Sequence, residues 1–144
     1  MKIVICSSIH FAEKIREIEK GLAGLGHDVV IPHSINEYNV KNHEDDDKLR
    51  KITANDHSIK QRFTRRHFNE IKDADAILVV NEEKRGIPNY IGGATLSEIM
   101  FAFYFSKKIF LLNPIPTDER LAFFRDEIEG VDPVVINGNL GLIE

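Results

Sequence analysis

The sequence predicts an α/β fold with a flavodoxin-like three-layer arrangement, in which helices cover both faces of a parallel sheet. Short apolar segments recur along the 144 residues, and segments with apolar residues at helical spacing separate most of them. Continuous apolar runs are typical of strands buried on both faces, and their alternation with helices favours a parallel sheet. At this length we expect one domain over residues 1–144, with five strands in the order 2-1-3-4-5.

The first part of the chain supplies two strands and the helix between them. Residues 3–6 and 29–31 are apolar runs, and Pro32 closes the second. Gly26 ends the intervening helix, because glycine readily adopts the conformation found after a helix C-terminus. One face of this helix carries the apolar residues Phe11, Ile15, Ile18, Leu22 and Leu25.

Residues 34–56 depart from this alternation. The segment is rich in Asn, Asp, Glu, His and Lys, and it contains the acidic run 44–47. A long loop in a compact domain is usually functional or partly disordered. We therefore expect either a flap near the site, with a short helix at about 47–52, or a solvated surface loop.

The alternation then resumes. Ile59, Phe63 and Ile71 share one helical face, and residues 76–80 form a third, fully apolar strand. A helix over about 94–106 leads to a fourth strand at 109–112.

The last helix and strand follow two prolines, Pro114 and Pro116, which end the fourth strand. Thr117 is the expected N-cap of a helix that Gly130 ends, and residues 134–136 form the fifth strand. The inner side of this helix carries Leu121, Phe124 and Ile128.

The composition argues against several partners. A net charge of −4 argues against a nucleic-acid-binding protein, and no apolar run reaches the length of a membrane span. The single cysteine, Cys6, excludes an internal disulfide and fits a reducing compartment such as the cytoplasm. The histidines lack metal-ligand spacing, so we expect neither a metal site nor a cofactor.

The predicted strand order places a ligand crevice beyond the carboxyl ends of the first and third strands. The segments 7–10 and 81–95 must flank it. Gly92 and Gly93 would let a ligand approach the backbone closely. Candidate hydrogen-bonding residues for phosphate or sugar are Ser7, Ser8, Thr95 and Ser97. Asn81 would hydrogen-bond to a ligand or stabilise a local turn.

Glu98 is the chief candidate for chemistry. We expect it in the first turn of the helix that follows this crevice, where the helix dipole would keep the carboxylate ionised. It is then a candidate nucleophile or ligand anchor, or simply a favourable charge at a helix start.

Other chemistries of such crevices fit poorly. A phosphoacceptor domain needs acidic residues where this chain has Ser7, Ser8 and Asn81. The sequence contains neither a dinucleotide-binding nor a P-loop glycine motif, and no Ser-His-acid nucleophile elbow.

Two stretches resemble the nucleoside 2-deoxyribosyltransferase superfamily, which includes deoxynucleoside-monophosphate N-glycosidases. The first is Asp75-Ala-Ile-Leu-Val-Val-Asn81, followed by Ile91-Gly-Gly-Ala-Thr-Leu-Ser-Glu98 and Lys108-Ile-Phe-Leu-Leu-Asn-Pro114. The second is Cys6-Ser-Ser-Ile9, which resembles the first loop of that family, where phosphate or sugar is contacted.

The resemblance implies a retaining glycosyl transfer. Glu98 would attack the anomeric carbon of a nucleoside or nucleotide, and Ser7, Ser8 and Ile9 would contact the substrate. Transferases of the family usually carry an Asp at or near the positions of Asn81 and Gly92, so hydrolysis, or binding without turnover, fits this chain better than base exchange.

Two further features stay open between a functional and a structural interpretation. The basic cluster Arg62, Arg65, Arg66 and His67 would cover a phosphate or form a solvated helix face. Tyr90 would stack on a nucleobase or pack within its own domain.

The helix that carries Glu98 also predicts assembly. Residues 99–105 are apolar on all sides, and a helix of that kind must be buried all round. We expect a homodimer or a dimer of dimers, with Phe101 or Tyr104 and Phe105 near the contact.

Overall fold

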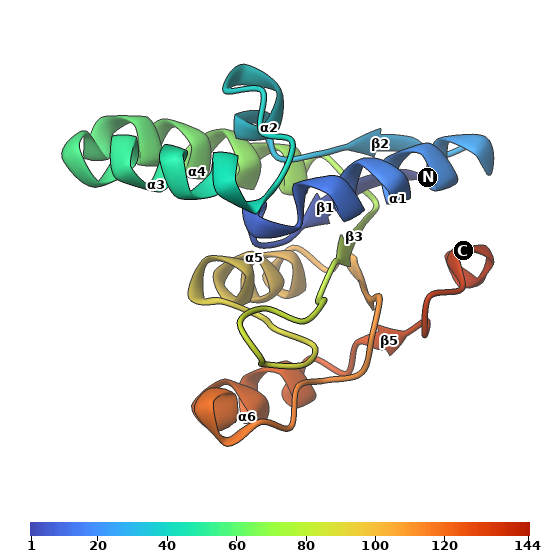
Figure 1. Ribbon diagram of the computed structural model, residues 1–144. Coiled ribbons are helices and arrows are strands. Elements are labelled where there is room, and N and C mark those ends of the chain that lie inside the picture. The colour runs from blue at the N-terminus through green and yellow to red at the C-terminus, as the bar shows by residue number, and fades with distance from the viewer.

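The computed structural model describes residues 1–144 and contains a five-stranded, all-parallel sheet in the order β2-β1-β3-β4-β5 (Figure 1). The predicted α/β class and strand order are therefore confirmed. The strands are β1 (Lys2–Cys6), β2 (Asp28–Val30), β3 (Ala76–Val79), β4 (Lys108–Leu111) and β5 (Val134–Val135). The helices are α1 (Ala12–Gly24), α2 (His33–Glu37), α3 (His43–Asn55), α4 (His57–Lys72), α5 (Gly93–Tyr104) and α6 (Ala122–Gly130), with short 3₁₀ turns at Ile9–Phe11, Glu119–Leu121 and Leu140–Leu142.

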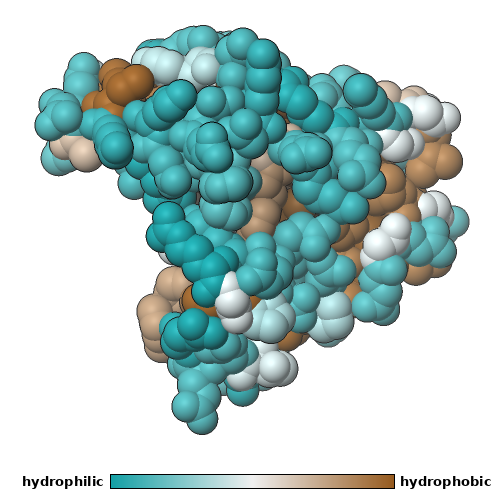
Figure 2. Space-filling model, viewed as in Figure 1, coloured by the Kyte–Doolittle hydropathy of each residue, from teal (hydrophilic) through white to brown (hydrophobic).

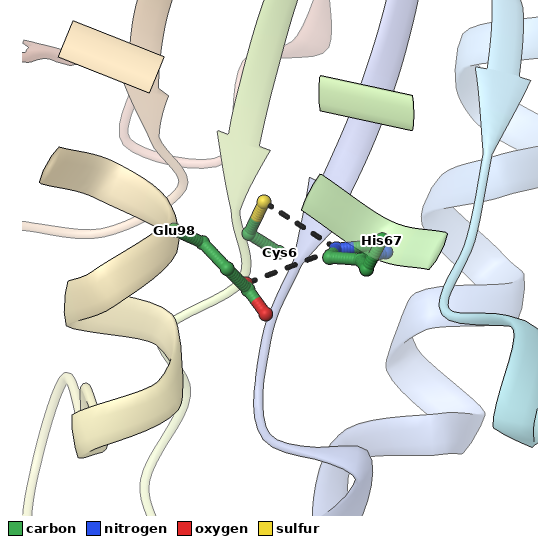
Figure 3. Close-up of side chains that lie close together, drawn as sticks. All are labelled: Cys6, His67 and Glu98. Carbon is green, nitrogen blue, oxygen red and sulfur yellow. Dashed lines mark hydrogen bonds and ion pairs between the residues drawn. The ribbon is translucent and has the colours of Figure 1, made fainter. Parts of the chain in front are cut away.

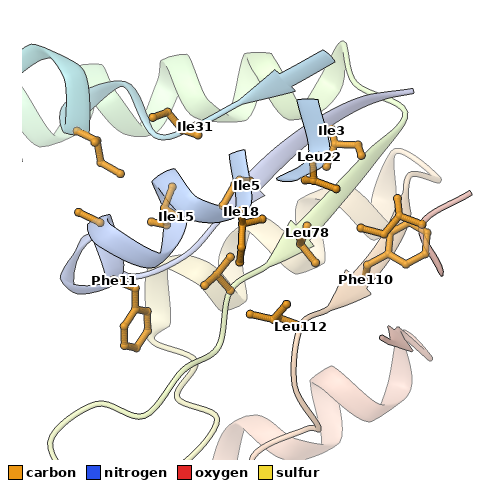
Figure 4. Packing of buried hydrophobic residues seen from close by; sticks show 14 of the residues in the cluster. Ile3, Ile5, Phe11, Ile15, Ile18, Leu22, Ile31, Leu78, Phe110 and Leu112 are labelled. Carbon is orange, nitrogen blue, oxygen red and sulfur yellow. The ribbon is translucent and has the colours of Figure 1, made fainter. Parts of the chain in front are cut away.

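The alternation of side chains along the strands divides the core into two layers. In β1, Ile3 and Ile5 face the layer that contains α1, where they pack with Ile15 and Leu22 (Figure 4). Val4 and Cys6 point to the opposite face, which α4, α5 and α6 cover with Ile71, Ile99 and Ile128. Cys6 therefore lies beneath α4 and α5 because of its place in the strand.

The segment 34–56 is largely helical: the expected short helix at about 47–52 is part of the longer α3, and the expectation that the rest forms a loop is wrong. Asn42 caps α3 by accepting a hydrogen bond from the Asp45 amide at 3.0 Å. Acidic residues in the first turn suit the positive end of the helix dipole. Of this helix only Asp46 and Leu49 are buried, and α3 packs beside α4 (Figure 1).

The predicted cap at Thr117 is also wrong. Asp118 accepts a hydrogen bond from the Arg120 amide at 2.9 Å and caps a 3₁₀ turn, and α6 begins only at Ala122. The acidic side chain one residue later takes the role that Thr117 was expected to have.

Hydrophilic residues cover most of the face seen in Figure 2, and hydrophobic residues show there in separate patches. None of the helices combines the length and apolar character that a membrane crossing requires.

Candidate functional site

A cavity of about 470 Å³ opens beyond the carboxyl ends of β1 and β3, where the crevice was predicted. Its volume lies in the range of small-molecule sites, roughly 300–1,000 Å³. The loop after β1, helices α3 and α4, and the segment before α5 all contribute to its walls. The lining residues are Ser7, Ser8, Ile9, Pro32, His33, Ser34, Asp46, Leu49, Arg50, Thr53, Lys60, Phe63, His67, Lys84, Tyr90, Gly92, Gly93, Ala94 and Thr95.

Most residues predicted to bind a ligand meet at this cavity. Ser8, Ile9, Gly92, Gly93 and Thr95 all line it, although they come from two distant parts of the chain. A side chain at Gly92 would crowd Tyr90, since a Cβ there would lie 3.1 Å from the Tyr90 hydroxyl oxygen. The glycine therefore lets the aromatic ring and the start of α5 share one wall.

Ser7 also lines the cavity, but its hydroxyl has a structural partner. It donates a hydrogen bond to the carbonyl oxygen of Val80 at 2.9 Å. This bond joins the end of β1 to the end of β3 at the floor of the cavity.

The side chain of Asn81, which was predicted to contact a ligand, is taken up by hydrogen bonds within the protein. It is fully buried and does not line the cavity. Its side-chain amide donates to the carbonyl oxygens of Asn113 and Pro114 at 2.9 and 3.0 Å, and its oxygen accepts from the Asn113 amide at 2.9 Å. The residue thus joins the end of β3 to the end of β4.

Lys84 gives one end of the cavity a buried positive charge. Its residue is only 5% exposed, its Nζ donates to Ser8 Oγ at 3.0 Å, and Nζ lies 4.8 Å from the centre of the Tyr90 ring. Burial lowers the pKa of Lys84, with Arg50 contributing in the same direction. A buried ammonium group in a cavity wall is a natural partner for an anion.

The start of α5 adds to this attraction for anions. Gly92 is its N-cap and has no side chain that could accept hydrogen bonds from the first amides of the helix. These free amides form the positive end of the helix dipole. Arg50 and Lys60 also line the cavity. Arg50 is held by Asp46, whose carboxylate lies 3.1 Å from Arg50 Nε.

Glu98 does not line the cavity and forms a cluster with Cys6 and His67 (Figure 3). His67 Nε2 lies 3.7 Å from Cys6 Sγ and 3.8 Å from Glu98 Oε2. The three side chains come from β1, α4 and α5 and point toward one another in Figure 3. Only His67 of the three lines the cavity, and the Glu98 side chain is 14% exposed.

The protonation state of Glu98 differs from the prediction. Burial raises its pKa to about 8, so the carboxyl group is mostly protonated at neutral pH rather than ionised. It also lies in the second turn of α5, not the first, because the helix already begins at Gly93. The helix dipole acts mainly within the first turn and does not offset the loss of water around this carboxyl group.

His67 and Cys6 are neutral as well. Burial lowers the pKa of His67 to about 4, and burial raises the pKa of the Cys6 thiol well above its usual range. The contact between His67 and Glu98 is therefore a polar contact between neutral groups and not an ion pair at neutral pH.

The cluster is poorly satisfied by hydrogen bonds. His67 Nδ1, Glu70 Oε2 and Glu98 Oε2 are buried without a hydrogen-bond partner in the protein. Unpaired buried polar atoms cost free energy, so native proteins contain few of them. Three such atoms around one histidine indicate a site for chemistry or binding.

The sequence contained a signal for His67 that the basic-cluster interpretation missed. His67 lies four residues before Ile71 and four after Phe63, so it shares the helical face already assigned to the core. Lys84 carried no comparable signal, since its burial depends on how the loop after β3 folds.

No known protein family matches this chain, and no curated protein is significantly similar to it. The fold and the site define a class: an α/β domain of flavodoxin-like topology with a small-molecule cavity at the point where the strand order reverses.

Proposed function

We propose that this protein cleaves the N-glycosidic bond of a nucleoside or nucleoside monophosphate, with Glu98 as the nucleophile. One observation carries the proposal: α5 presents its N-terminus to the cavity and carries Glu98 one turn further on, in contact with the cavity residue His67. The resemblance to nucleoside 2-deoxyribosyltransferases supports the same role for Glu98.

The cavity offers suitable surroundings for the parts of a nucleotide. Lys84 and the first amides of α5 would hold the phosphate, with Ser8 beside them. Tyr90 supplies an aromatic ring in the wall for a nucleobase. Thr95 and the glycines before it also line the cavity and would meet the sugar.

The reaction would proceed in two steps. The Glu98 carboxylate attacks C1′, the C1′–N bond breaks, and the departing base takes up a proton. Water then cleaves the glycosyl ester and restores the carboxylate. Because burial keeps Glu98 protonated, the group must lose its proton before it can attack.

A second candidate function is nucleotide or nucleotide-sugar binding without turnover. It is favoured by the position of Glu98, which is protonated, largely buried and outside the cavity lining. The missing acidic residues at Asn81 and Gly92 favour it too.

The proposal includes assembly and location. Tyr104 and Phe103 are 79% and 53% exposed on α5, whereas Phe101 packs between Phe68 and Phe105 with ring centres 4.6 and 4.7 Å apart. A second copy covering the exposed aromatic residues would give a homodimer, or a dimer of dimers. A free buried thiol suits a protein of the cytoplasm.

Base release decides between the two functions. The wild-type protein and the Glu98→Gln variant are incubated with a panel of ribo- and deoxyribonucleoside monophosphates and the matching nucleosides, and free base is measured by chromatography. A glycosidase releases base only in the wild type, while both proteins still bind substrate. Tight binding without any release by the wild type would support the binding module instead.

A further inference from the structure

We propose that Cys6, His67 and Glu98 form a binding site for zinc or a similar thiophilic divalent metal ion. Sulfur, imidazole nitrogen and carboxylate oxygen are the three donor types that proteins use for zinc, and harder ions such as Mg²⁺ avoid such a mixture. The three donor atoms lie within 4.8 Å of one another and belong to three different elements, β1, α4 and α5.

The spacing of the donors suits tetrahedral coordination. With metal–ligand bonds of about 2.0–2.3 Å, neighbouring donors in a tetrahedron lie roughly 3.3–3.8 Å apart. His67 Nε2 lies 3.7 Å from Cys6 Sγ and 3.8 Å from Glu98 Oε2. The third pair, Cys6 Sγ and the Glu98 carboxylate, lies up to 4.8 Å apart, so these two groups would have to approach each other by roughly 1 Å to close the site around an ion.

The unpaired atoms around the cluster point to a missing partner. Glu98 Oε2 has no hydrogen bond, although it is buried against His67. On the far side of the imidazole ring, His67 Nδ1 lies 3.8 Å from Glu70 Oε2, and both of these atoms are also unpaired. This is the order of groups found at metal sites, where a ligating histidine turns its second nitrogen toward a carboxylate.

The charges of the three donors and the route from the cavity also suit a divalent metal ion. A bound dication would be neutralised by the Cys6 thiolate and the Glu98 carboxylate, and the protons of the thiol and of the carboxyl group would both pass to solvent on binding. His67 lines the cavity, so an ion can reach the site from there, and the fourth position remains for water or a ligand. The inference does not rest on the proposed function, and the two exclude each other at any one moment, because the ion would occupy the carboxylate that the glycosidase reaction needs.

Cobalt titration tests the site directly, with Co²⁺ alone as the probe. Cys6 is the only cysteine, so a thiolate-to-cobalt charge-transfer band can arise from no other residue. We expect one equivalent of cobalt, an absorption spectrum of tetrahedral cobalt with this band, and loss of the spectrum when one equivalent of Zn²⁺ is added. A wild-type protein that binds no cobalt, or binds it without the thiolate band, overturns the proposal without any variant.

Matched histidine variants then test the second ligand. His67→Gln should weaken cobalt binding at least tenfold, whereas His57→Gln, at an exposed position at the start of the same helix, should leave it unchanged. Circular dichroism verifies that each variant is folded. Equal cobalt affinity in the folded His67→Gln variant would rule out this histidine as a ligand and overturn the proposed site.

Discussion

Lys84 Nζ lies 3.0 Å from Ser8 Oγ, so a buried ammonium group spans the gap between the loop after β3 and the loop after β1. The two loops come from neighbouring strands, and the contact brings a positive charge to the cavity wall. The cavity therefore has a defined end for an anionic group.

Replacing this lysine should weaken phosphate binding selectively. Lys84→Met keeps the length of the side chain but removes a charge-assisted hydrogen bond, worth roughly 1.5–3 kcal/mol, or about ten- to hundredfold in affinity. Calorimetry should show this loss for a nucleoside monophosphate and a much smaller one for the nucleoside. Lys48→Met, on the exposed side of α3, is the control and should bind both normally. Equal losses for the two ligands would place the phosphate elsewhere.

The activity of the metal-free enzyme should rise with pH. Attack requires the Glu98 carboxylate, and burial raises the pKa of this group to about 8. With a chelator present, kcat/KM should therefore increase about tenfold per pH unit below pH 8 and level off above it. Initial rates of base release, measured from roughly pH 5.5 to 9.5 in buffers of constant ionic strength, give kcat/KM as a function of pH. A rate that falls as the pH rises toward 8 would indicate that Glu98 acts as an acid and not as a nucleophile.

The same carboxyl group should make folding stability depend on pH. Its pKa is higher in the folded protein than the ordinary value of 4.5, so its stabilising contribution is complete at low pH and is lost as the pH rises through about 8. His67 acts in the opposite sense. Its pKa is lowered from the ordinary value of 6.5, so it reduces the stability of the folded protein only at pH values below about 6.5. Between pH 6.5 and 8 the carboxyl group thus dominates this pair.

Glu98→Gln isolates this effect. Urea unfolding of the metal-free proteins should show that wild-type stability falls between pH 6.5 and 8.5, at up to roughly 1.4 kcal/mol per pH unit, and that the variant is nearly flat there. Parallel curves for the two proteins would mean that Glu98 is already ionised in the folded state.

Asn81 should matter for stability and not for binding. Asn81→Ala removes its side-chain hydrogen bonds to the partly buried backbone groups of Asn113 and Pro114, which should cost about 2–4 kcal/mol. Chemical denaturation measures the loss, and ligand affinity should stay within about twofold below the unfolding transition, a difference of about 0.4 kcal/mol. Asn55→Ala, which removes one exposed hydrogen bond in α3, should change stability far less.

Assembly through α5 can be tested by light scattering. The wild type should have at least twice the chain mass of 16.4 kDa at micromolar concentration, because its exposed aromatic side chains would be covered by a second copy. Tyr104→Glu should give monomer or aggregate, whereas Leu25→Glu, an equally drastic change after α1, should leave the mass unchanged. A wild-type mass near 16.4 kDa would exclude the dimer.

The strands were predictable because a strand that is buried on both faces consists of a continuous run of apolar residues. The runs 3–6 and 76–80 contain no polar residue, and the structure places β1 and β3 there with their residues almost entirely buried. Helix α3 was predicted only in part, as a short helix at about 47–52, for the opposite reason. It buries only Asp46 and Leu49, so its apolar periodicity is too weak to identify, although Asn42 followed by acidic residues is a helix-start signal.

The candidate site was predictable in its position but not in its chemistry. The strand order places Ser8, Gly92 and Thr95 together. The protonation of Glu98 and the burial of Lys84 depend on packing between elements distant in sequence. The dipole of α5 favours an ionised Glu98, but α4, which is distant in sequence, covers the carboxyl group and removes it from water.

The position of the cavity between an interior pair of strands and a mostly exposed helix has a consequence for hydrogen exchange. Amides of β1 and β3 lie in the middle of the sheet, hydrogen-bonded to neighbours on both sides, and should exchange only through global unfolding. Amides of α3, which buries two side chains, should exchange through small local openings. A ligand that fills the cavity would therefore slow deuterium uptake in α3 far more than in β1 and β3. That contrast would locate the ligand before its identity is known.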